Sequence, residues 1–187
     1  MMAGTRLVAV LAVVAAACGG ALGVDEYFAG VEAAAVQFDR DGADLAGRYD
    51  AQLDEGIAAL GSKYDLDDPD QVASLAADAT SLGISTTVDL LRAREQSYRR
   101  FIAEMESLAP PGEAADAHDA SLSALRAAVD ALPATIAAVG GLEDVGELAA
   151  AVTVSPFGAA QERLGDACRE LQRVADAAVV EVDLRCG

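Results

Sequence analysis

Cys168 and Cys186 are the residues whose type and spacing most plainly permit a reaction with each other. Residues 168–178 fit a helix that rises about 15 Å at 1.5 Å per residue. The eight residues that follow can return about 26 Å when extended. The tail can therefore fold back onto this helix, and in an oxidising compartment we expect a disulfide. A redox-active pair or a thiolate metal site is the alternative, but the close C-x-x-C spacing typical of both is absent.

His118 is the single histidine of the chain. A zinc site needs further nitrogen or sulfur ligands, and the Glu-x-x-His pairs of di-iron bundles require two histidines. We therefore interpret His118 as a partly buried structural residue near one end of a helix. The alternative is a haem ligand, with Met105 as the second axial candidate.

The clusters of charged residues have simpler interpretations than a binding site. The acidic run 65–70 lacks the glycine and the bidentate glutamate of a calcium-binding EF-hand loop, and segment 39–42 fails similarly. Capping and solvation explain both, with a weak surface calcium site as the alternative.

The basic residues are concentrated at Arg92, Arg94, Arg99 and Arg100. The pairs Glu95–Arg99 and Arg100–Glu104 predict a salt-bridged helix surface, and contact with an anion or an acidic partner is the alternative.

Sequence signatures of catalysis are missing from the chain, which contains no Gly-rich phosphate loop, no G-x-S-x-G and no H-E-x-x-H. One histidine without a spacing clue does not define a catalytic triad. The sequence therefore predicts a protein that is not an enzyme and has neither a metal nor another cofactor.

Four long amphipathic segments must position these side chains. Apolar or small residues recur every three or four positions, as on a helix packed against other helices. The segments span about 25–63, 69–108, 113–139 and 156–178. Residues 142–152 predict a short, weaker helix or an ordered loop, and the alternating residues 179–184 predict an extended tail.

The boundaries of these segments carry local signals. Asp68 and Ser155 each precede a proline, the pattern of an N-cap followed by proline at the first helical position. Gln71 is predicted to complete a capping box with Asp68. Pro133 interrupts the third segment, so we expect a kink or a break there.

Short connections between four long helices predict an all-α, up-down four-helix bundle with a short extended C-terminal tail. Aromatic residues make up 4% of the 187 residues and tryptophan is absent, so leucine, valine, isoleucine and alanine must form the core. This length suits one domain, which we place at residues 25–187.

Residues 1–17 have the pattern of a signal peptide. Arg6 is the one charge before Asp25, and it precedes an apolar run over residues 7–17 that ends in small residues. This run is too short to cross a bilayer as a stable helix, which requires about 20 apolar residues. We therefore exclude it from the fold.

The segment Ala15-Ala-Ala-Cys18-Gly-Gly20 resembles the lipobox of bacterial lipoproteins, although alanine replaces the usual leucine at position 15. The resemblance covers the signal region and implies that Cys18 is lipidated and becomes the first mature residue. Residues 18–24 would then form a lipid-anchored linker. A lipid on Cys18 also accounts for the odd number of cysteines, since the other two can pair. The alternative is an ordinary signal peptide cleaved after Ala17 or a few residues later.

The formal net charge of −18 argues against nucleic-acid binding and against broad adhesion to anionic lipids. The sequence thus predicts an exported lipoprotein, tethered to the cell membrane by its N-terminal lipid and facing the extracytoplasmic side. Its predicted role is that of an envelope component or a binder of a protein partner. The alternative is a carrier of a small apolar or haem-like ligand, because Ala-rich stripes containing Gly42 can leave a cavity in the bundle core.

Overall fold

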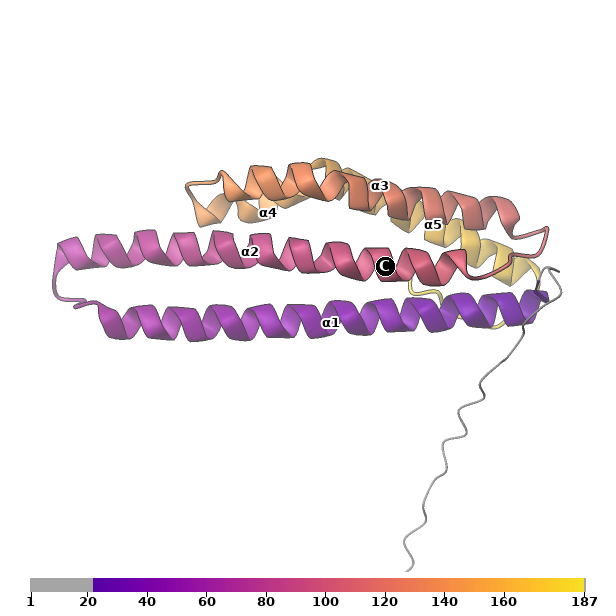
Figure 1. Cartoon of the computed structure of the whole chain (residues 1–187), viewed down its shortest axis with the longest axis horizontal. Helices are drawn as coiled ribbons and strands as arrows, with labels where there is room; N and C mark the ends of the chain where they lie inside the picture. Colours follow the sequence, from indigo (N-terminus) through magenta and orange to yellow (C-terminus); the bar gives the residue numbers. More distant parts are fainter. Residues whose placement is uncertain (1–21, 187) are drawn as a thin grey trace, which may run out of the picture.

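The computed structural model describes residues 22–186, and every regular element within them is helical (Figure 1). The α-helices are α1 (Val24–Lys63), α2 (Pro69–Glu106), α3 (Ala115–Gly140), α4 (Leu148–Thr153) and α5 (Pro156–Ala177). A 3₁₀ turn, η1 (Val145–Glu147), precedes α4. The predicted all-α class is therefore correct. The helix count is five rather than four, because the weakly patterned segment after α3 forms η1 and α4.

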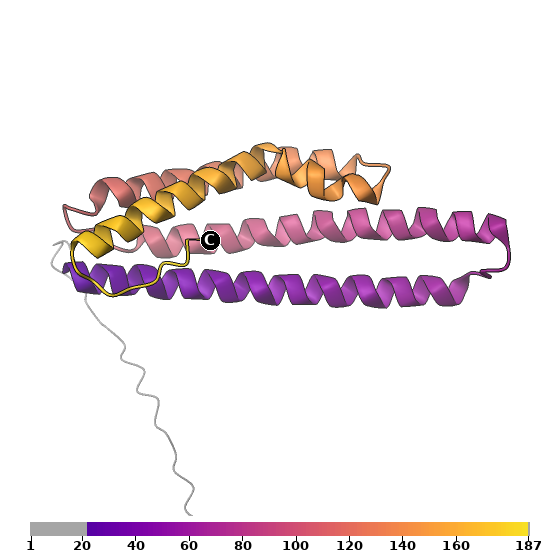
Figure 2. The same cartoon turned by 180° about the vertical axis from the view of Figure 1, so that it is seen from behind.

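The long helices run alternately in opposite directions, with α1 packed on α2, α2 on α3, and α3 on α5 (Figures 1 and 2). The C-terminal tail, residues 178–186, leaves α5 and passes beside α1 (Figure 2). The tail therefore links α5 to α1, two long helices that are not adjacent in this packing order.

The predicted apolar stripe of α1 faces the core at Phe28, Val31 and Leu45, which are all buried. Tyr27 is also fully buried, next to the start of this stripe. The glycines within α1 do not interrupt it, since α1 is one helix of 40 residues. Packing of the apolar face thus outweighs the intrinsic cost of each glycine, about 1 kcal/mol.

Both predicted proline-containing helix starts are present. The Asp68 carboxylate accepts a hydrogen bond from the Asp70 N–H at 3.0 Å, and the Ser155 hydroxyl accepts one from the Gly158 N–H at 3.1 Å. The predicted capping box of Gln71 is wrong in detail, because its side-chain oxygen accepts from the N–H of Asp65 at 3.0 Å. The side-chain nitrogen of Gln71 donates to the Asp68 carboxylate at 3.0 Å, so Gln71 both supports the cap residue and closes the turn before the helix.

Of the kink or break expected at Pro133, the break does not occur, since α3 runs unbroken from Ala115 to Gly140. Proline removes one intrahelical hydrogen bond, and its own side chain is exposed. The neighbouring Leu132 and Thr135 are fully buried, so packing on both sides holds the helix together. A second small difference is that α3 starts at Ala115, which leaves Glu113 ahead of its first turn.

Within the described residues, α3 is also the one helix long and apolar enough to cross a membrane by length and composition. This criterion is weak evidence, because the core helix of a soluble domain satisfies it as well. Here α3 packs against both α2 and α5 and buries ten of its residues. We therefore treat it as the central helix of the fold.

Candidate functional site

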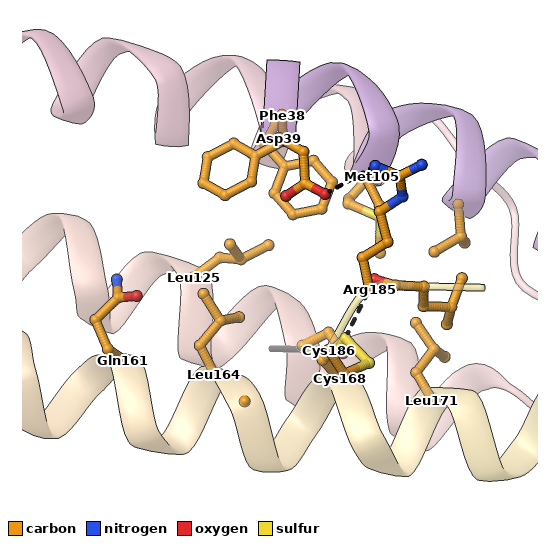
Figure 3. A pocket seen from close by; sticks show the side chains of 16 residues that line it. Phe38, Asp39, Met105, Leu125, Gln161, Leu164, Cys168, Leu171, Arg185 and Cys186 are labelled. Atoms are coloured by element: carbon orange, nitrogen blue, oxygen red, sulfur yellow. Dashed lines mark hydrogen bonds and ion pairs between the residues drawn. A yellow bond between two sulfur atoms is a disulfide. The ribbon is translucent and has the colours of Figure 1, made fainter. Parts of the chain in front are cut away.

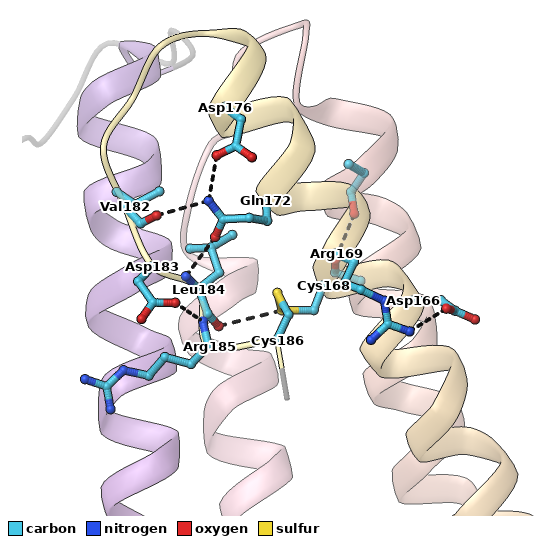
Figure 4. The surroundings of a disulfide bond; sticks show 12 residues. Asp166, Cys168, Arg169, Gln172, Asp176, Val182, Asp183, Leu184, Arg185 and Cys186 are labelled. Atoms are coloured by element: carbon cyan, nitrogen blue, oxygen red, sulfur yellow. Dashed lines mark hydrogen bonds and ion pairs between the residues drawn. A yellow bond between two sulfur atoms is a disulfide. The ribbon is translucent and has the colours of Figure 1, made fainter.

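The C-terminal tail is fastened to α5 by a disulfide between Cys168 and Cys186, whose Cα atoms lie 5.4 Å apart (Figure 4). The Cys168 sulfur also lies 3.6 Å from the Leu184 carbonyl oxygen. A disulfide sulfur carries no proton, so this second approach is a packing contact. The cysteines predicted to pair are thus joined, and they fix the end of the tail to the middle of α5.

Gln172 provides a second attachment of the tail (Figure 4). Its side-chain nitrogen donates to the Val182 carbonyl at 3.0 Å, and its side-chain oxygen accepts from the Leu184 N–H at 2.9 Å. The amide therefore pairs with the tail backbone as a neighbouring strand would. Apolar side chains alternate inward as predicted for an extended segment, and Leu184 is 3% exposed.

Two polar contacts connect the tail with α1. The N–H of Asp183 donates to the Glu32 carboxylate at 3.0 Å, and the Arg185 guanidinium lies 3.4 Å from the Asp39 carboxylate. The Asp39–Arg185 pair is about half-exposed, so solvent weakens it. The disulfide and Gln172 therefore hold the tail more firmly than this ion pair does.

A cavity of about 230 Å³ lies beneath the tail, between α1 and α5 (Figure 3). Helix α1 contributes Val31, Ala35 and Phe38, and α5 contributes Leu164 and Leu171. The remaining apolar lining comes from α2, α3 and the tail: Phe101, Met105, Leu125 and Leu184. The lining is therefore mainly aliphatic and aromatic, and the tail forms one of its walls.

The polar side chains of this lining are each bonded to another group of the protein. Ser121 donates to the Ala117 carbonyl at 2.9 Å, and Gln161 donates to the Tyr98 hydroxyl. Asp39 and Arg185 pair with each other. The cavity thus offers an apolar environment in which these polar groups already have partners.

His118 lies buried beside Tyr27, whose hydroxyl is 2.9 Å from the histidine Nδ1. Tyr27 belongs to α1 and His118 to α3, so the pair joins two helices far apart in sequence. Burial raises the pKa of Tyr27, so its hydroxyl is the donor and a neutral histidine Nδ1 accepts. Burial lowers the pKa of His118 below its ordinary value, and nearby Asp119 opposes this shift. The neutral imidazole is therefore the form that fits the fold.

We predict that acid destabilises the wild-type protein more than a His118→Gln variant. The pKa of His118 is lowered in the folded protein. The full stabilisation by neutral histidine is therefore present above about pH 6.5, the ordinary pKa of histidine. It is lost as the pH falls from there through the folded-state pKa. Glutamine retains an oxygen that can accept from Tyr27 and does not titrate. Urea unfolding between about pH 8 and pH 5 measures the difference, and parallel curves for the two proteins would contradict it.

The structure does not support a haem with His118 and Met105 as its two axial ligands. Met105 lines the cavity, whereas His118 is not among the lining residues and its Nδ1 is engaged by Tyr27. The two candidate ligands therefore do not face one common cavity.

The acidic run has a structural role. Asp65 accepts from the N–H of Asp67 at 3.0 Å, and Asp68 caps α2. No group of three or more histidine, cysteine or acidic side chains among residues 22–186 is arranged to hold a metal ion. The turn geometry thus accounts for the acidic spacing.

The basic residues of α2 form ion pairs, though only partly as predicted. Arg99 pairs with Glu95 at 2.7 Å, one turn away. Arg100 pairs with Asp41 of α1 at 2.6 Å instead of with Glu104, so this arginine joins two helices. The hydrogen bond from Arg100 also lowers the pKa of Asp41.

Cys18, the predicted signal peptide and most of the predicted linker lie outside the described residues. Of the linker, Leu22 donates its N–H to the Ala109 carbonyl at 3.1 Å, and Val24 begins α1. Comparison of the chain with protein-family models, with curated proteins and with solved structures finds no match.

Proposed function

We propose that this chain is an exported, lipid-anchored, non-enzymatic envelope protein that presents a helical bundle to a protein partner. In this proposal Cys18 carries the lipid, and the protein faces the extracytoplasmic side of the cell membrane. The four long helices act as an up-down four-helix bundle, with η1 and α4 as an insertion. The disulfide supports an oxidising compartment, because such bonds persist where thiols are not kept reduced.

The observation that carries the proposal is the projection of the α1–α2 hairpin beyond the other helices (Figures 1 and 2). We call residues 57–76 the hairpin tip; they comprise the end of α1, the connecting turn and the start of α2. The end of α3 lies beside α2 farther from the turn, where Gly140 and Leu142 share a shallow depression with Ala77 and Thr80. The tip therefore extends past the part of the hairpin that α3 covers.

The hairpin tip combines exposed apolar side chains with negative charge. Ile57, Leu66 and Val72 are 50%, 64% and 42% exposed. The tip contains four acidic residues and one basic residue, and that residue, Lys63, already pairs with Asp78 at 3.1 Å. A second copy would bring like charges together. The complementary partner is therefore a protein surface with basic side chains around an apolar patch.

A matched pair of variants tests this proposal. Leu66→Ser/Asp67→Lys removes one exposed apolar side chain and reverses one charge at the tip. Val154→Ser/Asp130→Lys makes the same two kinds of change, an apolar residue to serine and an aspartate to lysine, at exposed positions elsewhere. Each variant and the wild-type protein are used to recover partners from solubilised envelopes of the native host.

We expect wild type and the control variant to recover the same basic partner, and the tip variant to lose it. Recovery should also fall as salt rises from about 0.1 M to 1 M, because the Debye length shortens from about 10 Å to 3 Å. Equal recovery by all three proteins, or recovery of no basic partner by the wild type, would contradict the proposal.

A further inference from the structure

We infer that the cavity beneath the C-terminal tail is a binding site for a small, neutral, apolar molecule about the size of a two-ring aromatic. The site lies between α1 and α5 (Figure 3), and none of its lining residues belongs to the hairpin tip. It is therefore independent of the partner binding proposed above.

The size of the cavity indicates the size of the ligand. Protein interiors are packed so closely that spaces larger than one water molecule are few. An engineered apolar cavity of about 150 Å³ stays dry and binds benzene. The present space of about 230 Å³ is larger than that, and it is partly open to solvent at Asp39 and Arg185. A bicyclic molecule, or an alkyl chain of similar volume, fits this scale.

The lining indicates a neutral ligand. Most of it is hydrocarbon, contributed by side chains such as Phe38, Leu125 and Leu164. Asp39 and Arg185, the charged groups of the lining, neutralise each other. A charged ligand would lose its hydration without gaining an unpaired counter-ion from this lining, and that loss is costly.

The tail acts as a fastened cover for this site. Leu184, Arg185 and Cys186 all line the cavity, and the disulfide with the Gln172 amide holds them over it (Figure 4). Displacing the tail would remove one wall while leaving the walls from the helices in place. A bound molecule should therefore leave more slowly when the disulfide is intact.

Calorimetric titration with naphthalene tests the site, using the purified oxidised protein. We expect saturable binding of one molecule per chain. The charged analogue 2-naphthoate should bind at least about tenfold more weakly, because its carboxylate would be desolvated. Failure of naphthalene to bind, or equal binding of both compounds, would overturn the inference.

A matched pair of substitutions on α1 locates the binding. Ala35 lines the cavity and Ala43 is exposed on the same helix. Ala35→Leu should weaken naphthalene binding about tenfold or more by filling the space, whereas Ala43→Leu should leave it unchanged. Leu164→Phe fills the cavity from α5 and serves if Ala35→Leu does not fold. Equal binding by a folded cavity-filling variant and by Ala43→Leu would place the ligand elsewhere and overturn the inference.

Two further variants separate the cover from the hairpin tip. Cys168→Ser/Cys186→Ser should release naphthalene several-fold faster than the disulfide-bonded protein, and an unchanged rate would overturn the role of the tail. Leu66→Ser/Asp67→Lys should bind naphthalene as wild type does. Loss of partner recovery with intact naphthalene binding, or the reverse, therefore shows which of the two proposals fails.

Discussion

Replacing Cys168 and Cys186 by serine is expected to lower the free energy of unfolding by about 3 kcal/mol. The bond joins residues separated by 18 positions and closes a short loop. Without it the unfolded chain gains conformational freedom, while the folded tail must still be ordered. For a chain of this length such a loss corresponds to a fall in melting temperature of about 6–12 °C. Urea unfolding of the oxidised wild type and of the double variant measures the difference.

Wild type treated with a reductant serves as the matched control, because it loses the bond and keeps the cysteine side chains. Its stability should fall close to that of the double variant. The secondary structure of α1, α2 and α3 should remain, since the tail is attached to α5 and to the surface of α1. A change below about 1 kcal/mol would mean that the disulfide contributes little to the folded state.

The second large effect is expected from Cys18→Ser in the native host. If Cys18 carries the lipid, as proposed, the wild-type protein should sediment with membranes and the variant should be released into the soluble exported fraction. Each buried CH₂ of an acyl chain contributes about 0.8 kcal/mol, and several chains together make anchoring stable. The net charge of −18 gives the unlipidated protein little attraction to an anionic lipid surface.

The intact mass of protein extracted from membranes provides the control for this experiment. It reports the acyl chains on Cys18 and the loss of two hydrogen atoms in the disulfide in one measurement. A wild-type protein that lacks lipid, or a serine variant that stays with the membrane, would contradict the proposed anchor. Detection of free thiols at Cys168 and Cys186 would contradict the proposed oxidising compartment.

Local signals in the sequence predicted the helices because their causes lie within a few residues. Asp68 and Ser155 cap their helices as neighbours of proline, and the cap geometry depends on three or four consecutive residues. The stripe through Phe28, Val31 and Leu45 repeats with the helical period, so burial on one side followed from spacing alone. Helix existence and approximate bounds were therefore predictable.

At two positions the structure departs from what the local residue preference favours. Pro133 has a helix-breaking effect, but buried neighbours keep α3 continuous. Val179 turns the chain out of α5 with a φ of 60°, a conformation that a valine seldom adopts, and no glycine in the sequence indicated it. The Val180 N–H donates to the Ala175 carbonyl at 3.0 Å, so the helix end is closed by a local hydrogen bond although no glycine is present.

Some contacts of the candidate site were predictable from the sequence and others were not. The sequence by itself determined that Cys168 and Cys186 could meet, because helix rise and chain length set the reach of the tail. The tertiary structure alone decided that Tyr27 meets His118, that Gln172 holds the tail, and that Asp39 lies opposite Arg185. The Tyr27–His118 and Asp39–Arg185 contacts join segments distant along the chain, and the cavity is lined by four helices and the tail. They depend on how whole helices pack, which no periodic pattern within one helix specifies.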